Sequence, residues 1–198
     1  MAPAAVVPDL ARFGVKLFAA QTPEDVLKRA VPVFHRWIQN HTVPGVLVDV
    51  ADYGHLPKSP GVVLVTHEAN FALDATEGPL GLLYTRKIPL EGTLEARVKA
   101  ASVVVLEAAS QLEGAPEFEG KLRFRTDLLL WLSNDRLSVP NTEDAWAAVR
   151  PALTAVFAPL FGEGASIARE TSDPRRRLTV RVTSPGPVGL SMLRARLG

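Results

Sequence analysis

Apolar residues that recur with a helical period predict a first helix, which begins at Thr22 and extends to about position 40. Thr22 can cap its N-terminus, Pro23 suits the first turn, and Glu24 and Asp25 complement the positive end of the helix dipole. Pro32 lies inside the segment and predicts a kink. The residues on the apolar arc are Val26, Leu27, Ala30, Val31, Phe34, Trp37, Ile38 and His41.

The same period predicts three further helices. One spans about 93–113, where the run Val103–Val105 indicates burial on several sides. Another begins at Thr142, which two acidic residues follow, and reaches Phe161. A short helix over 190–197 is predicted at the end of the sequence.

Alternating apolar residues predict strands, and the most informative stretch is Gly61–Asp74. It predicts one long strand, or two strands joined by a bulge near Glu68. A hairpin loop follows, and 80–87 returns as a partner strand. One face would carry Val63, Val65, His67, Ala69, Phe71 and Leu73, and the other Val62, Leu64, Thr66, Glu68, Asn70, Ala72 and Asp74.

A second long strand is predicted over Lys121–Ser133. Its apolar face would carry Leu122, Phe124, Thr126, Leu128, Leu130 and Leu132, and its other face Arg123, Arg125, Asp127, Leu129 and Trp131. Leu129 and Trp131 would form an exposed apolar patch suited to a dimer or partner interface. Shorter strands are predicted at 15–19, 46–50, 166–171 and 177–183.

Hairpins outnumber β–α–β units in this order of elements. The predicted fold class is therefore α+β, a mostly antiparallel (mixed) sheet with two to three long amphipathic helices packed on one face. Residues 13–198 would form a single domain, preceded by a flexible N-terminal arm over 1–12. A faint echo between the first and third helices suggests an internal duplication relating 13–113 to 121–183, although two amphipathic helices show such similarity by chance.

Composition narrows the chemistry. The 198 residues include no cysteine, which excludes disulfide frameworks, thiolate metal sites and cysteine nucleophiles. Acidic and basic residues number 21 and 22, so no global field attracts nucleic acid or an anionic membrane. No apolar run approaches the length of a membrane helix, and the expected location is the cytoplasm. Charge is uneven, since 101–163 is net acidic and 164–198 is net basic.

The first candidate for chemistry is an acid–base set of His67, Asp49 and His55. His67 lies in an apolar row, so a structural histidine with one satisfied hydrogen bond explains it as well as a catalytic one. Adjacent strand residues point to opposite faces, so His67 and Glu68 are not expected to share a metal, and no metal site or cofactor is predicted. Asp52 and His55 end a strand, where loops commonly carry sites.

The second candidate is a ligand-binding surface on the polar face of the sheet, rich in arginine. Arginine offers bidentate contacts to carboxylate or phosphate, so the set predicts an anion pocket. Cross-strand ion pairs on a solvated sheet and a surface for a protein partner are the alternatives. The candidate residues are Glu68, Tyr84, Arg86, Arg123, Arg125, Arg177 and Arg181.

These observations favour a non-catalytic intracellular binding or scaffold domain of a bacterial protein, with a homodimer as one form. Its charged sheet face would contact a protein partner or an anionic small ligand. The alternative is a metabolic enzyme that uses histidine–carboxylate acid–base chemistry on an anionic small substrate. A module that binds nucleic acid or the ribosome through the basic tail is a third hypothesis, against which the near-neutral charge weighs.

Overall fold

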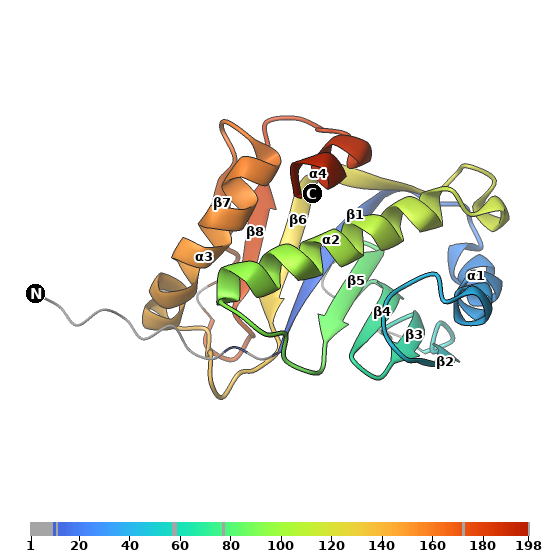
Figure 1. Ribbon diagram of the computed structural model, residues 1–198, viewed down its shortest axis with the longest axis horizontal. Coiled ribbons are helices and arrows are strands. Elements are labelled where there is room, and N and C mark those ends of the chain that lie inside the picture. Colours follow the sequence, from blue (N-terminus) through green and yellow to red (C-terminus); the bar gives the residue numbers. More distant parts are fainter. Residues whose placement is uncertain (1–9, 11, 57–58, 77, 172, 198) are drawn as a thin grey trace, which may run out of the picture.

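The structure is a computed structural model in which residues 10, 12–56, 59–76, 78–171 and 173–197 are described (Figure 1). The predicted N-terminal arm lies outside the described residues except for Leu10 and Arg12, and Leu10 is fully buried. The strands are β1 (Phe13–Gln21), β2 (Leu47–Asp52), β3 (Val62–Thr66), β4 (Ala69–Asp74), β5 (Gly81–Arg86), β6 (Arg123–Ser133), β7 (Ser166–Arg169) and β8 (Thr179–Thr183). The helices are α1 (Val26–Asn40), α2 (Leu94–Glu113), the 3₁₀ helix η1 (Pro116–Phe118), α3 (Glu143–Phe161) and α4 (Leu190–Leu197).

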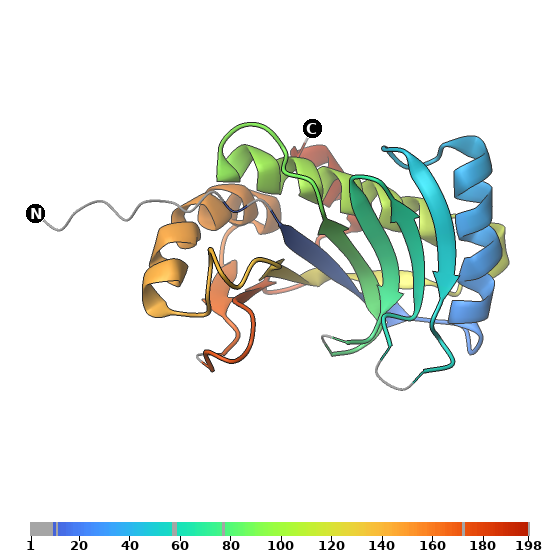
Figure 2. The same cartoon turned by 90° about the horizontal axis from the view of Figure 1, so that it is seen from below.

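The strands form one sheet in the order β2-β3-β4-β5-β1-β6-β8-β7, and every neighbouring pair is antiparallel. This confirms the predicted α+β class. Figures 1 and 2 show α2 lying across one side of the sheet, with α3 and α4 beside it over β6, β7 and β8. The first part of the predicted duplication, 13–113, runs strand, helix, strands, helix, whereas 121–183 runs strand, helix, strands and α4 lies beyond it. The first strands of the two parts, β1 and β6, pair with each other.

Local signals set two of the helix starts. The side-chain oxygens of Thr93 and Thr142 accept hydrogen bonds from the backbone N–H groups three residues later, as N-caps do. The prediction that the first helix starts at Thr22 is wrong, because β1 continues to Gln21, which still pairs with β6. The chain needs a turn after that pairing, so α1 begins only at Val26.

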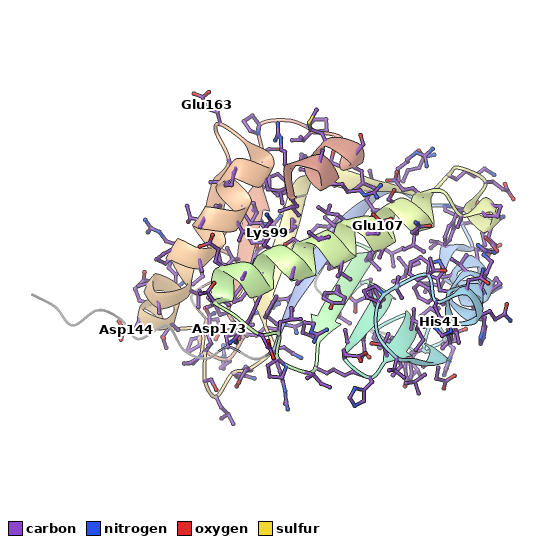
Figure 3. All side chains as sticks on the ribbon, viewed as in Figure 1. His41, Lys99, Glu107, Asp144, Glu163 and Asp173 are labelled. Atoms are coloured by element: carbon purple, nitrogen blue, oxygen red, sulfur yellow. The ribbon has the colours of Figure 1, made fainter. Side chains whose placement is uncertain are left out.

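α1 ends at Asn40, and His41, which is labelled in Figure 3, caps its C-terminus. The backbone of His41 is left-handed, with φ of 48°. Of the two forms predicted for 61–74, the single long strand is wrong. The segment forms two strands that break near Glu68, as the second form has it, but a hairpin turn joins them instead of a bulge. His67 and Glu68 form a two-residue turn between β3 and β4, because Val65 pairs with Asn70. The hydroxyl of Thr66 closes the turn by bonding to both the N–H and the carbonyl of Ala69, 3.0 Å each.

The main hydrophobic core lies between the helices and one side of the sheet. Trp131 and Leu129 belong to it and are fully buried, and the indole of Trp131 stacks on Phe13 with ring centroids 6.0 Å apart. The predicted exposed patch of these two residues is therefore wrong. Their neighbours Leu128 and Leu130 face the opposite side and form a small cluster with Phe18.

An irregularity in the pairing of β6 with β1 explains this reversal. Leu129 pairs with Leu17, but Phe124 pairs with Ala19. Between these two pairs the chain moves five positions along β6 and only two positions along β1. The three additional residues are an odd number, and they invert the alternation of faces along the strand.

Within the described part of the chain, no helix has the length and apolar character needed to cross a membrane.

Candidate functional site

The predicted acid–base residues do not converge. His67 sits at the β3–β4 turn with two thirds of its side chain exposed, and its Nδ1 is 3.7 Å from Oε1 of Glu68. Asp49 is exposed on the edge strand β2 and accepts a hydrogen bond from the N–H of Val50. Arg125 lies on β6, which is three strands away from β4 in the sheet. It is also near the opposite ends of the strands from the β3–β4 turn. The enzyme hypothesis in its predicted form therefore has no shared cleft.

His55 borders a separate hollow at the start of α1, with a volume of about 460 Å³. Asp52 also lines it, but its Oδ1 accepts the N–H of Gly54 at 2.8 Å and so shapes the loop. The remaining described lining residues are Glu24, Asp25, Val26, Leu27, Lys28, Gly54 and Leu80. Among the described residues, no group of three or more histidine, aspartate and glutamate side chains could hold a metal ion.

Glu68, Tyr84 and Arg86 come together, but on the helix-covered side. Glu68 accepts the N–H of Val46 at 3.0 Å, and this bond lowers the pKa of its carboxyl group. Arg86 donates to the Tyr84 hydroxyl at 3.3 Å and to the carbonyl of Ile88 at 3.0 Å. Burial raises the pKa of the Tyr84 phenol. The cluster fastens the chain after α1 to the sheet, which is a structural role.

Arg123 and Arg177 lie apart from each other and from this cluster. Arg123 donates to the carbonyls of Leu122 and Glu113, at the end of α2. Arg177 donates to the side-chain oxygen of Asn134 at 3.3 Å, beside an open depression of about 790 Å³. The described residues around that depression are Arg12, Ser133, Asn134, Asp135, Arg136, Leu137, Ser138 and Arg177.

The last two predicted arginines, Arg125 and Arg181, share one hollow of about 380 Å³. It lies on the side of the sheet opposite the main core, between the end of β1, β6, β8 and the chain that follows β7. Its described lining is Phe18, Ala19, Gly78, Pro79, Arg125, Leu128, Leu130, Glu170, Thr171, Arg176, Thr179 and Arg181.

The floor of this hollow is apolar and its rim is charged. Phe18, Leu128 and Leu130 are buried against one another. In a regular strand Arg125 and Leu128 would point to opposite faces, but the irregularity in β6 brings both into the same hollow. The fold therefore places guanidinium groups beside an apolar surface.

Two ion pairs of the same geometry define the electrostatics of the rim. Arg125 donates through Nε and Nη2 to the two carboxylate oxygens of Asp127, at 3.0 and 2.7 Å. Arg181 donates likewise to Glu170, at 2.7 and 2.6 Å. These hydrogen bonds raise the pKa of both guanidinium groups and lower that of Asp127. Both arginines line the same hollow, and the repulsion of Arg125 opposes the rise in the pKa of Arg181.

Beside the hollow lies a feature that the sequence interpretation missed. Lys16 and Asp74 are almost fully buried and form an ion pair of 2.9 Å, with the ammonium 5.3 Å from the ring centre of Phe18. A lysine within the otherwise apolar run of β1 was the available signal. Glu170, Arg176 and the apolar floor were missed too, because they reach the hollow only through the fold.

The loop between β7 and β8 carries Asp173, which binds the guanidinium of Arg175 with a closest distance of 3.2 Å and accepts its backbone N–H at 3.0 Å (Figure 3). These bonds hold the segment that brings Arg176 to the hollow.

The sequence matches no known protein-family model, and no curated protein is significantly similar to it.

Proposed function

We propose that this chain is a non-catalytic binding domain whose ligand is a small anion with an apolar part, bound in the hollow of Arg125 and Arg181. The observation that carries the proposal is the convergence of these two guanidinium groups on an apolar floor. The predicted alternative of a structural set of ion pairs accounts for the pairs themselves, but not for the cavity beneath them.

The chemistry of the lining supports this class of ligand. Phe18, Leu128 and Leu130 favour an aromatic or aliphatic group, because burying it removes apolar surface from water. Arginine suits carboxylate, since its planar fork gives two parallel hydrogen bonds. A volume of about 380 Å³ lies within the range of small-molecule sites.

The same lining argues against catalysis at this site. The described residues around it include no histidine, and their one carboxylate, Glu170, is held in an ion pair. General acid–base chemistry needs a group that is free to exchange a proton with the substrate. Binding is the function that these groups can perform as they are arranged.

Titration calorimetry with a matched set of probes tests the proposal. Naphthalene-2-carboxylate should bind with a Kd of about 1 mM or below, the scale expected for a ligand of this size. Its neutral carboxamide should bind at least about tenfold more weakly, and inorganic phosphate should not compete with it, because phosphate lacks the apolar part.

Variants identify where the probe binds. R125Q and R181Q should each weaken carboxylate binding towards the affinity of the carboxamide. R169Q is the matched control, because Arg169 precedes Glu170 in sequence but pairs with Glu143 on α3. Equal affinities for carboxylate and carboxamide, or unchanged carboxylate binding by both R125Q and R181Q, would refute the proposal.

A further inference from the structure

The two ion pairs of the hollow differ in where their carboxylates lie. Both guanidinium groups use the same Nε and Nη2 edge, and both pairs are partly exposed. Asp127 is not part of the lining, whereas Glu170 is. Arg125 is thus neutralised from outside the hollow, and Arg181 from within it.

We infer that Glu170 is a built-in competitor for the ligand, an internal carboxylate that occupies the anion-binding edge of Arg181. This inference rests on the proposed function and concerns the regulation of the same site. An incoming carboxylate must take over the bonds of Arg181 that measure 2.7 and 2.6 Å, or bind beside a negative charge. Either route lowers the affinity for anions.

The position of Glu170 makes displacement feasible. It directly follows the last residue of β7, and its backbone N–H bonds to the carbonyl of Thr179 at 2.8 Å. The backbone is therefore anchored, while about a third of the side chain is exposed. The carboxylate can rotate towards solvent without disturbing the sheet, since its hydrogen bonds to the described residues go to the side chain of Arg181.

The competitor also sets specificity. Arg181 keeps further N–H donors beyond the two that Glu170 uses, because a guanidinium has five. At the Nε and Nη2 edge of Arg181, a ligand carboxylate only replaces the equivalent hydrogen bonds of Glu170, so its charge alone adds little binding free energy. Amphipathic carboxylates with enough apolar surface to fill the floor should therefore be favoured over small anions, whose only contribution is charge.

Calorimetry with naphthalene-2-carboxylate distinguishes competition from support. E170Q should bind the probe about fivefold more tightly than the wild-type protein, the scale of one partly exposed ion pair. E143Q is the matched control, because it removes the partner of Arg169, which precedes Glu170 in sequence, and it should leave the Kd unchanged. In the double variant E170Q/R181Q the gain should disappear, because the freed guanidinium is its source.

The outcomes separate this inference from the proposed function. If the wild-type protein binds the probe and E170Q binds it equally or more weakly, Glu170 supports Arg181 and the inference is overturned alone. If neither protein binds, the proposed function fails with it. As a second measurement, the NMR resonance of the Arg181 Nε–H should shift on saturation of the wild-type protein, and an unchanged resonance contradicts displacement of Glu170.

Discussion

Replacing Lys16 with methionine tests the buried ion pair beside the hollow. Methionine has a similar length and keeps the apolar stem, so the change removes chiefly the ammonium group. Asp74, of which 1% is exposed, then keeps the N–H of Thr76 at 3.2 Å and the Thr76 hydroxyl at 2.7 Å. Those two bonds satisfy part of the carboxylate, but its charge loses the cation at 2.9 Å.

The expected cost follows from this residual bonding. Breaking a buried pair by removing one partner costs about 3–5 kcal/mol, because an uncompensated charge stays in the interior. Two remaining hydrogen bonds reduce that cost, so we expect K16M to lower the free energy of unfolding by about 2–4 kcal/mol. For a domain of this size the loss corresponds to a fall in Tm of about 5–12 °C.

Urea denaturation, followed by tryptophan fluorescence, measures the change. K99M is the matched control, since Lys99 is exposed on α2 (Figure 3), and it should shift stability by no more than about 0.5 kcal/mol. Adding D74N to K16M should recover about 1–2 kcal/mol, because the amide carries no charge to bury. A cost below about 1 kcal/mol for K16M, or no recovery in the double variant, would contradict this account of the pair.

Two further predictions concern the surface and the sheet. The pKa of Glu119 lies at about 2, below its ordinary 4.5, because Arg29 and then Lys121 donate hydrogen bonds to it. The contribution of Glu119 to stability is present above about pH 4.5 and is lost as the pH falls towards 2. When Tm is measured from pH 5 to 2, E119Q should therefore lose less stability over this range than the wild-type protein. An unchanged slope would argue against the ion pairs of Glu119 with Arg29 and Lys121. At Gly81 a Cβ would lie 2.2 Å from a backbone carbonyl oxygen of β1, so G81A should cost at least about 3 kcal/mol in urea denaturation, while G186A, which meets no atom within 4 Å, should be near neutral.

The parts of the fold that the sequence predicts are those with local causes. Thr142 caps α3 because its hydroxyl needs only the N–H of Ala145, three residues away. Thr22 has the same local signal, yet β1 pairs through Gln21 and delays the helix. At His67 the sequence allows a break near Glu68 but predicts a bulge there and not a turn, since hairpin pairing of β3 with β4 depends on partners that alternation within one segment does not reveal.

The candidate site depends on a change of face that no local pattern announces. Period-two alternation placed Arg125 on the correct side of β6 but put Leu129 and Trp131 beside it, because it assumed an uninterrupted strand. Because β6 has three more residues than β1 across this irregularity, Leu128 and Leu130, and not Leu129 and Trp131, lie on the same side of the sheet as Arg125. The charged face therefore has an apolar floor, and the two together form the hollow. A sequence interpretation that allows one such inversion within a long, partly charged strand would have joined the arginines to the apolar residues. That juxtaposition, rather than the arginines by themselves, favours an amphipathic anion over a simple one.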